Sequence, residues 1–310
     1  MSDDCGLAAA RTILRDAVAT RLRENFALAP LTSFRLGGPA ALYLEAESDA
    51  DLEVAGRAIS ASGIPHVVIG KGSNLLVSDK GFEGLVLRLG RGFRWVARDG
   101  ARLTAGAAMP LPALAGVALS HALAGLEFGV AIPASLGGCV RMNAGAHGHS
   151  LDEAVERVEI YLLGEGAKGW IGADEAGFAY RSSALPDATV VTAADLRLSP
   201  GNPGEIRTHM DEAREWRRAT QPLAEPNCGS VFKNPPGDHA ARLVEAAGAK
   251  GLSVGGARVS EKHSNFVVAS PGTTAEDVYH LITMVRERVR ERFGTELEME
   301  VHLVGRFPER

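Results

Sequence analysis

The sequence predicts an α+β protein made of about two domains, or of three small ones. Its 310 residues exceed the roughly 150 residues that one domain usually holds. Segments with strand and helix patterns follow one another along the chain, and residues 41–69 form a β-α-β unit. The hydrophobic content of 45% and the charged content of 23% are those of an ordinary globular protein.

Charge and cysteine content exclude several classes of function. A net charge of −5 gives no general affinity for nucleic acid or for an anionic membrane. The three cysteines are Cys5, Cys139 and Cys228, without a CxxC pair, which argues against a disulfide framework or a zinc site. The start of the chain is acidic, unlike a signal peptide, and no apolar run reaches ~18 residues. We expect a soluble protein of the cytoplasm.

Periodic patterns define the elements of the first half of the chain. Leu14, Val18 and Leu22 share one face of a helix predicted over residues 7–23. Ser48, with an acid three residues later at Asp51, is expected to begin a helix between a strand at 41–45 and a buried strand at 66–69. Further strands are predicted at 75–77, 84–89, 93–97, 103–105, 155–163 and 189–198, with a helix at 111–123.

The composition changes after residues 199–204, SPGNPG, which are predicted to be a linker. A long helix at 274–293 would bury one apolar face, formed by Val278, Leu281, Ile282 and Val285. The other elements predicted here are helices at 205–218 and 238–247, a turn into a strand at 227–235, a strand entered from 262–266 and a closing strand at 297–304.

A glycine-rich stretch from Gly125 to Gly148 contains few charges and a proline, Pro133. Glycine at this density weakens regular structure, so the stretch needs unusual dihedral angles or a close approach of its backbone to something else. Around Gly137-Gly138 and Ala144-Gly145-Ala146, small side chains are expected to leave backbone N–H groups open to a bulky ligand. A crossover between two sheets explains the same composition, and the residues leave both interpretations open.

A second glycine loop, Gly70 to Asn74, follows the strand predicted at 66–69. Successive N–H groups in such a loop can form an anion-binding nest. The loop lacks the GK[ST] of a Walker motif, and residues 75–77 continue as a strand instead of the helix of a GxGxxG unit. A tight turn explains the loop more simply, and a diphosphate here would require a fold other than the Rossmann fold.

Seven stretches between Thr32 and Val301 match the motifs of one enzyme family in that family's order. They are TSFRLGG at 32–38, GKGSNLL at 70–76, GLEF at 125–128 leading to NAG at 143–145, YRSS at 180–183, CGSVFKNP at 228–235, VSEKH at 259–263 and EMEV at 298–301. By these motifs the chain resembles the UDP-N-acetylenolpyruvoylglucosamine reductases (UDP-N-acetylmuramate dehydrogenases, MurB). The short gap between Asn234 and Gly251 resembles the type II members.

The resemblance implies the FAD-binding fold of vanillyl-alcohol oxidase, the PCMH type, with a smaller α+β substrate-binding domain. The domains expected from it are an N-terminal helix in 1–27, an FAD-binding part of two lobes in 28–200 and a substrate-binding domain in 201–299. Residues 300–310 are expected to return to the FAD-binding part as a strand. We also expect a monomer and, from the net charge and the lack of a long apolar run, no nucleic-acid partner and no membrane insertion.

The implied reaction reduces the enolpyruvyl group of UDP-N-acetylglucosamine enolpyruvate and gives UDP-N-acetylmuramate, a peptidoglycan precursor. NADPH is the implied reductant and FAD the implied cofactor, bound without a covalent link. The residues implied to bind FAD lie in the two glycine-rich stretches. They are Gly70, Lys71, Gly72, Ser73, Asn74, Leu75, Pro133, Ser135, Gly137, Gly138, Asn143, Ala144 and Gly145.

Three catalytic residues are implied by the same resemblance. Ser230 would protonate C2 after hydride reaches C3, and Arg181 would hold the negative charge that develops on the substrate carboxylate. Glu300 would lie beside the reacting group, where an ionised carboxylate opposes that charge, so we expect it to be protonated or to act through water. The residues implied to bind substrate are Tyr180, Lys233, Asn234 and Lys262.

The sequence departs from the family at Thr220, where relatives often have a lysine directly before Gln-Pro. That lysine could reach the substrate phosphate or carboxylate, and Arg217, Arg218 or Lys262 are the candidates to replace it. Two other functions stay open. One is an FAD oxidoreductase of the same fold that acts on a different sugar or alcohol, and the other is a non-catalytic nucleotide-binding protein.

Other residues resemble chemical motifs but lack the necessary partners. His147 and His149 have no third metal ligand at a useful spacing, so we expect no metal site. Cys228 has no associated histidine and acid pattern, so we expect it to pack in the core and not to act as a nucleophile.

Overall fold

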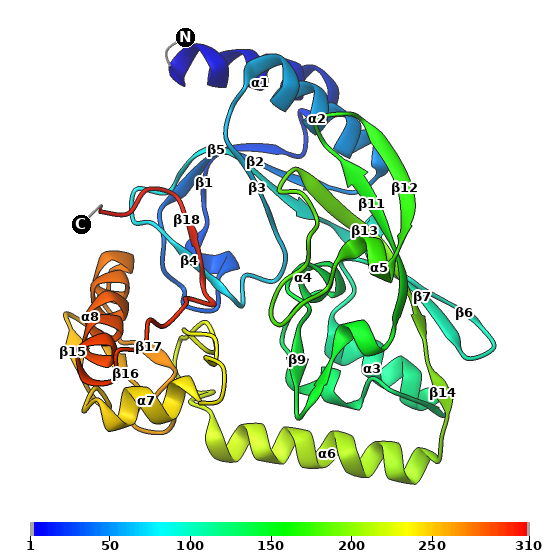
Figure 1. Ribbon diagram of the computed structural model, residues 1–310. Helices are drawn as coiled ribbons and strands as arrows, with labels where there is room; N and C mark the ends of the chain where they lie inside the picture. Colours follow the sequence, from blue (N-terminus) through cyan, green and yellow to red (C-terminus); the bar gives the residue numbers. More distant parts are fainter. Residues whose placement is uncertain (1–2, 309–310) are drawn as a thin grey trace. The chain divides into compact units, whose positions relative to one another are not determined.

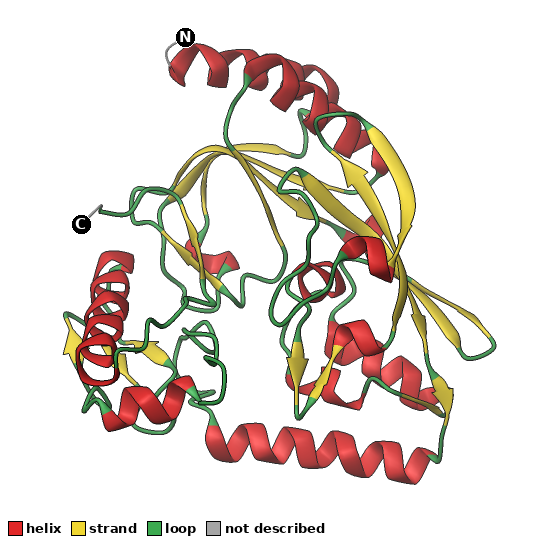
Figure 2. Ribbon diagram, in the orientation of Figure 1, coloured by secondary structure: helices red, strands yellow, loops and turns green. Residues whose placement is uncertain are grey.

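The structure is a computed structural model that describes residues 3–308, and its internal contacts divide the chain into two compact units (Figure 1). Unit 1 contains the N-terminal segment up to Glu24 together with Leu42–Lys71 and Gly84–Trp216. Unit 2 contains Asn25–Ala41, Gly72–Glu83 and the segment from Arg217 onward. Both units mix helices and strands (Figure 2), as expected of an α+β protein.

The helices range from single turns to five turns in length. The α-helices are α1 (Asp3–Val18), α2 (Asp49–Ser62), α3 (Leu111–Ser120), α4 (Leu136–Arg141), α5 (Ala173–Ala176), α6 (Pro203–Thr220), α7 (Ala240–Ala246) and α8 (Ala275–Phe293). Short 3-10 helices are η1 (Ala29–Leu31), η2 (Arg91–Phe93), η3 (Glu127–Ala131) and η4 (Leu151–Glu153).

Most strands are short. They are β1 (Leu22–Ala27), β2 (Pro39–Ala46), β3 (His66–Ile69), β4 (Leu75–Val77), β5 (Phe82–Leu89), β6 (Val96–Asp99), β7 (Arg102–Gly106), β8 (Leu123–Ala124), β9 (Gly145–Ala146), β10 (His149–Ser150), β11 (Val155–Leu162), β12 (Ala167–Gly172), β13 (Thr189–Arg197), β14 (Ser199–Pro200), β15 (Ser253–Val254), β16 (Ala257–Val259), β17 (Val267–Ala269) and β18 (His302–Val304). One four-stranded sheet has the order β1-β2-β5-β3, with β3 parallel to β5.

The main sheet of unit 1 has five strands in the order β12-β11-β13-β7-β6, all paired antiparallel. Val158, Ala194 and Ala105 share one face of this sheet and belong to a buried cluster with Leu111 of α3 and Leu136 of α4. Burial of these apolar side chains is the main contribution that holds the two helices on the sheet. The glycine-rich stretch therefore runs along a well-packed face of the sheet.

Helices α1 and α2 pack together in a second core of unit 1, through residues such as Leu14 and Leu52. Helix α2 begins as predicted, because the Asp51 carboxylate accepts a hydrogen bond of 3.1 Å from the Ser48 N–H. The prediction for α1 is wrong beyond Val18. There the Arg21 N–H donates to the Val18 carbonyl and closes a turn, and Leu22 begins β1.

Unit 2 is built around the three-stranded sheet β15-β16-β17 and helix α8. The predicted apolar face of α8 is confirmed, because Val278, Leu281, Ile282 and Val285 are all at most 1% exposed. The start of the helix is capped within unit 2 by the Asp79 carboxylate, which accepts hydrogen bonds of 2.9 and 3.0 Å from the first two N–H groups. Strand β18 pairs parallel with β4 in the same unit.

Several predicted elements are wrong where pairing over long sequence distances decides the structure. The predicted linker contains β14, which pairs with β8, and its Pro203 begins α6. Residues 227–235 form no strand, only single bridges at Ser230 and Phe232, and the closing strand is limited to 302–304.

The bounds and burial of other predicted elements also differ. The helix predicted at 111–123 ends at Ser120, and the strand predicted at 93–97 begins only at Val96. In the strand at 66–69 only Ile69 is buried. Strand β12 pairs with β11 at a position where the sequence pattern predicts no strand.

Candidate active site

The glycine-rich stretch of unit 1 is paired along its backbone and is not an open loop. Leu136 N–H donates to the Met109 carbonyl at 2.8 Å, and Gly137 N–H donates to the Ala107 carbonyl at 2.9 Å. The expectation that the Gly137 N–H is open to a ligand is therefore wrong. The chain is tightly packed at Gly137, because a Cβ there would lie 3.0 Å from the Cβ of Ala107, closer than side chains normally pack.

Gly70 and Ser135 bring the two predicted FAD-binding stretches together within unit 1. A Cβ built on Gly70 would lie 2.5 Å from the Ser135 hydroxyl oxygen, so a larger residue at 70 would force that hydroxyl to move. Ser135 is buried, whereas its neighbour Pro133 and the cation Lys71 are exposed. Gly138 follows in α4, where a Cβ would make an ordinary contact of 3.5 Å with the same hydroxyl.

The rest of the Gly70–Leu75 loop belongs to unit 2. Gly72 adopts a φ of +65°, and its carbonyl accepts a hydrogen bond of 3.0 Å from the Ser33 N–H. Ser73 is half-buried. The Asn74 side-chain amide donates to the Glu300 carbonyl at 2.9 Å, and Leu75 pairs with His302 at the start of β4. Asn74 thus contacts the main chain of a predicted catalytic residue.

Asn143 is 3% exposed and joins two neighbouring segments. Its amide nitrogen donates to the Ala179 carbonyl at 3.1 Å, and its amide oxygen accepts from the Asp152 N–H at 3.1 Å. The next N–H, that of Ala144, donates to the Cys139 carbonyl at 2.9 Å, so the expectation that it is open to a ligand is also wrong. Gly145 lies in the β9–β10 hairpin.

Arg181 lies in a tight turn of unit 1 and has a left-handed backbone, with a φ of +56°. Ala179 and Ser182 exchange hydrogen bonds of 3.1 and 3.2 Å and close the turn. The Arg181 guanidinium donates to the Gly145 carbonyl at 2.8 Å and lies 5.1 Å from the centre of the Tyr180 ring. Tyr180 itself is 54% exposed. The turn therefore presents a fixed cation and an aromatic ring side by side.

Ser230 lies in a segment of unit 2 that has backbone partners on both sides. It forms an antiparallel bridge with Phe266, and the next N–H, that of Val231, donates to the Asn265 carbonyl at 2.9 Å. On the other side the Val231 carbonyl accepts from the Glu300 N–H at 2.8 Å. Ser230 and Glu300, two predicted catalytic residues, thus lie on adjacent segments, which are joined by the hydrogen bond between the Glu300 N–H and the Val231 carbonyl.

Cys228 lies two residues before Ser230 on this segment, and its thiol is held protonated. Its side chain is fully buried, and burial raises the pKa of its thiol strongly above the usual range. The nearby carboxylate of Glu300 raises the same pKa further. A thiol held protonated in this way is a poor nucleophile at neutral pH.

Two of the residues predicted to bind substrate in unit 2, Lys233 and Asn234, follow Ser230 on the same segment, and the third, Lys262, lies between β16 and β17. Lys233 forms an ion pair of 2.6 Å with Glu298, and the Asn234 side chain accepts from the Ala240 N–H at 3.0 Å, at the start of α7. Lys262 is exposed, and its ammonium group donates to the Arg218 carbonyl at 2.5 Å. Two of the three cations suggested as replacements for the missing lysine are therefore neighbours.

Thr220 lies at the end of α6. The third suggested cation, Arg217, is half-buried and donates to the Gln221 side chain at 3.1 Å, and burial lowers its pKa.

The two histidines of the HGH motif make separate contacts. The His147 ring meets the Trp216 ring edge-on at 4.9 Å, and His149 bonds the Glu153 carboxylate at 2.8 Å. Within residues 3–308, no group of three His, Cys, Asp or Glu side chains is placed to hold a metal ion. No helix in that range is long and apolar enough to cross a membrane.

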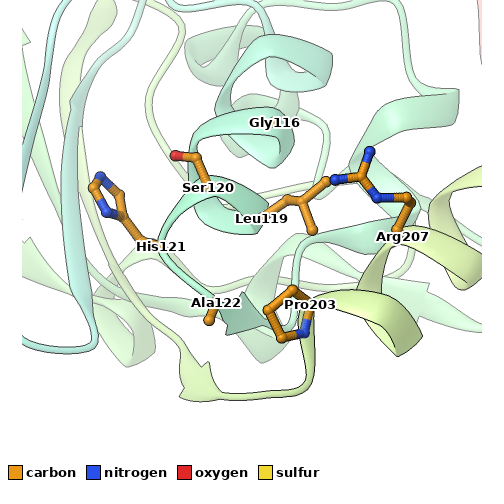
Figure 3. A pocket seen from close by; sticks show the side chains of 7 residues that line it. All are labelled: Gly116, Leu119, Ser120, His121, Ala122, Pro203 and Arg207. Atoms are coloured by element: carbon orange, nitrogen blue, oxygen red, sulfur yellow. The ribbon is translucent and has the colours of Figure 1, made fainter.

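A cavity of about 560 Å³ lies elsewhere in unit 1, between the end of α3 and the start of α6 (Figure 3). Leu119, Ala122 and Pro203 line it together with Arg207. The His121 ring points away from Arg207, so the polar groups do not converge (Figure 3). None of the predicted site residues lines this cavity.

Two family comparisons cover different parts of the chain. Residues 40–167 match an FAD binding domain. Residues 221–304 match the C-terminal domain of UDP-N-acetylenolpyruvoylglucosamine reductase. The predicted fold class, with its FAD-binding part and its smaller α+β domain, is confirmed.

Similar proteins extend the match over nearly the whole chain. The UDP-N-acetylenolpyruvoylglucosamine reductase of Anaeromyxobacter sp. (strain Fw109-5) is 46% identical over 280 residues, 90% of this chain and 87% of that protein. The reductase of the same name from Anaeromyxobacter dehalogenans (strain 2CP-C) is 45% identical over 299 residues, 95% of this chain and 90% of that protein.

Solved structures agree with these sequences. The crystal structure of UDP-N-acetylenolpyruvylglucosamine reductase (MurB) from Thermus caldophilus matches with a TM-score of 0.80 at 36% identity, covering 92% of this chain and 99% of that one. Physcomitrella patens BBE-like 1 shares the fold alone, with a TM-score of 0.55 at 12% identity over 91% of this chain and 88% of that one. Identity of 46% over 90% of its length shows that the chain belongs to the UDP-N-acetylenolpyruvoylglucosamine reductase family.

Proposed function

We propose that this chain is the flavoenzyme that reduces the enolpyruvyl group of UDP-N-acetylglucosamine enolpyruvate and yields UDP-N-acetylmuramate for peptidoglycan. NADPH is the reductant and FAD the cofactor. The observation that carries this proposal is the 46% identity to a reductase of that name over 90% of the chain. The rival function, a non-catalytic nucleotide-binding protein of the same fold, does not require the serine and the two charged side chains at the matching positions.

The residues of the two glycine-rich stretches fit FAD. The close approach of Gly70 to Ser135 joins two segments whose small residues let a bulky group come near the backbone. We propose that FAD is held without a covalent bond by the loop residues Gly70, Lys71, Gly72, Ser73, Asn74 and Leu75 and by Pro133, Ser135, Gly137, Gly138, Asn143, Ala144 and Gly145. The N–H groups of Gly137 and Ala144 already donate to carbonyl groups of the protein, so these two residues would contact FAD by van der Waals packing and not by hydrogen bonds.

FAD bound at these residues would supply, after its reduction by NADPH, a hydride for C3 of the enolpyruvyl group. The hydroxyl of Ser230 then donates a proton to C2. A hydroxyl is a weak acid, so this role requires neighbours that stabilise the oxygen anion left behind. Ser230 is suited to the role by its fixed main chain, which has hydrogen-bonded segments on both sides.

Arg181 stabilises the negative charge that develops on the substrate carboxylate. Its planar guanidinium can bind two oxygens at once, and a cation there is worth more in the transition state than in the ground state. Glu300 acts protonated or through a water molecule, because an ionised carboxylate would oppose the developing charge. Tyr180, Lys233, Asn234 and Lys262 bind the remainder of the substrate in this proposal.

A colour change tests the function. The purified protein should be yellow, NADPH should bleach it without air, and UDP-N-acetylglucosamine enolpyruvate should restore the colour. UDP-N-acetylglucosamine, which lacks the enolpyruvyl group, is the matched control and should restore nothing. Heat denaturation should release free FAD into the supernatant. A colourless protein, or bleached protein that the enolpyruvyl sugar leaves bleached, contradicts the proposal.

We further propose that the chain works as a monomer in the cytoplasm. We also assign 28–200 and 201–299 as the FAD-binding and substrate-binding domains, with 300–310, of which 309 and 310 lie outside the described residues, returning to the former. Light scattering at micromolar concentration should give the 32.6 kDa mass of one chain. A mass of twice that value contradicts the monomer.

A further inference from the structure

We infer that Asn265 is a positioning residue for the proton donor Ser230. The inference rests on the proposed role of Ser230, and it concerns unit 2 alone. Asn265 does not belong to any of the residues assigned above to cofactor, substrate or proton transfer. Its side chain acts on the main chain two residues beyond the donor.

The Asn265 side-chain amide takes the place of a backbone peptide group in the pairing with the Ser230 segment. Ser230 bridges Phe266, and Val231 donates to the Asn265 carbonyl, so the segment pairs with residues 265–266 up to this point. At Phe232 the pairing continues through the Asn265 amide instead. The amide oxygen accepts from the Phe232 N–H at 3.0 Å, and the amide nitrogen donates to the Phe232 carbonyl at 2.8 Å.

These two hydrogen bonds lie in the interior of unit 2. Asn265 is 4% exposed and Phe232 3% exposed. A side-chain amide has both a donor and an acceptor, as a peptide group does, so it can satisfy both backbone groups of Phe232 at once. Buried N–H and carbonyl groups nearly always have partners, and an alanine at 265 would remove both partners together.

The opposite edge of the segment fixes the same residues. The Val231 carbonyl accepts from the Glu300 N–H at 2.8 Å, and Lys233 N–H donates to the Glu298 carbonyl at 2.9 Å. Loss of the Asn265 side-chain bonds would leave the N–H and carbonyl of Phe232 without these two partners, while the Ser230–Phe266 bridge and the bond from the Val231 N–H to the Asn265 carbonyl remain. The Ser230 hydroxyl would then shift or become mobile, and a displacement of about 1 Å at a reacting group can cost ~10²-fold in rate.

Stopped-flow measurements of the two half-reactions test the inference in the FAD-bound enzyme. Asn265→Ala should slow the oxidative half-reaction, in which substrate is protonated, by ~10- to 10²-fold. Reduction by NADPH needs no proton from Ser230 and should stay within about twofold of the wild type. Equal slowing of both half-reactions, or an unchanged oxidative half-reaction, overturns the inference.

Ser264→Ala is the matched control. Ser264 is the neighbouring residue and is also buried, but its hydroxyl donates to the Glu245 carboxylate of α7 at 3.0 Å and not to the Ser230 segment. This variant loosens the same loop and should leave both half-reactions near the wild-type rates. If it slows the oxidative half-reaction as much as Asn265→Ala, the effect comes from the loop in general and the inference is wrong.

A double variant shows whether Asn265 acts through Ser230. In Ser230→Ala, the further change Asn265→Ala should cost less than threefold in the oxidative half-reaction, since the group that it positions is already gone. A full additional loss means that Asn265 acts on something else. If Ser230→Ala alone leaves the oxidative half-reaction intact, the proposed role of Ser230 fails and the inference falls with it.

Asn265→Asp covers the case in which the alanine variant does not fold. The carboxylate keeps an acceptor for the Phe232 N–H but has no donor for the Phe232 carbonyl. At pH 8 it should slow the oxidative half-reaction more than Ser264→Ala does, with normal FAD content and reduction by NADPH within about twofold of the wild type. A rate equal to that of the wild type overturns the inference.

Discussion

The turn that carries Arg181 and the segment that carries Ser230 are held in contrasting ways. In the turn, the functional side chain makes an anchoring bond itself, from its guanidinium to the Gly145 carbonyl. In the segment, the main chain is anchored from both edges, by residues 265–266 and by residues 298–300. The position of the Arg181 guanidinium thus depends on a bond that its own side chain makes. The position of the Ser230 hydroxyl depends on the hydrogen bonds of the main chain around it.

Backbone conformation follows the same contrast. Arg181 itself has the left-handed φ of +56°, which is costly for a residue with a side chain. In the other region this conformation belongs to Gly229, directly before Ser230, with a φ of +81°. Each region also uses a buried asparagine whose amide bonds main-chain groups, Asn143 in unit 1 and Asn265 in unit 2. The left-handed conformation thus falls on the functional residue itself in one region, where it is costly, and on a glycine beside the functional residue in the other, where it is not.

The largest effect is expected from removing the charge of Arg181. Arg181→Met keeps most of the side-chain volume and should lower turnover by ~10²- to 10³-fold, the usual cost of losing one group that stabilises transition-state charge. Arg181→Lys keeps the charge without the two-oxygen fork and should retain part of the activity. Steady-state turnover per bound FAD is the measurement. If the two variants lose turnover equally, or both lose FAD, Arg181 supports the fold or the cofactor instead.

A smaller effect is expected from a substitution that strains the backbone beside Ser230. The Cβ that Gly229→Ala adds would meet no atom within 4 Å, but an L-residue would be forced to a φ of +81°. The substitution should therefore lower the unfolding free energy by about 1–2 kcal/mol. If the segment shifts to relieve this strain, the oxidative half-reaction should slow by about tenfold, toward the cost of misplacing the donor.

Gly272→Ala provides the control for that experiment. Gly272 also belongs to unit 2 and has a φ of +88°, and a Cβ added there would meet no atom within 4 Å. Its substitution should lower the unfolding free energy by a similar amount and leave the half-reaction rates unchanged. Equal loss of rate in both variants would show that Ser230 is no more sensitive to backbone strain than the rest of unit 2.

The smallest effect concerns pH and the loop that contains Asn265. Burial lowers the pKa of His263, whose Nδ1 atom accepts from the Asn265 N–H at 3.3 Å. The unfolded chain would bind a proton below about pH 6.5 while the folded chain resists it, so stability should fall as the pH drops through this range.

Thermal unfolding midpoints between about pH 7.5 and 5.5 measure this effect. His263→Asn should lose less stability over that interval than the wild type. If His263→Asn and the wild type follow the same curve, the burial of His263 has no consequence for stability.

Local patterns in the sequence predicted the parts of the fold that local chemistry decides. The Ser48 and Asp51 spacing and the apolar face of α8 are confirmed because each depends on residues within a few turns of one helix. The open N–H expected at Gly137 is wrong because its partner, Ala107, lies thirty residues earlier in the chain. Composition shows where glycine occurs but does not identify the carbonyl that lies opposite.

The candidate site shows the same limit. Motifs place Ser230 and Glu300 in the sequence, but the pairing that makes them neighbours runs through the main chain of Val231. Asn265 was missed because one asparagine before an apolar strand carries no local signal for a partner thirty-three residues away. The only signal available was a polar residue at the edge of the buried run FVVA at 266–269.

Ser230→Ala, followed in both half-reactions by stopped-flow absorbance, tests the central claim most directly. If Ser230 donates the proton to C2, reduction of the bound FAD by NADPH should keep its wild-type rate, and reoxidation by the enolpyruvyl sugar should slow by ~10²- to 10⁴-fold. Flavin content and the unfolding midpoint should stay at their wild-type values. Slowing of both half-reactions to the same extent, or wild-type reoxidation, would contradict the assignment of Ser230 as the proton donor.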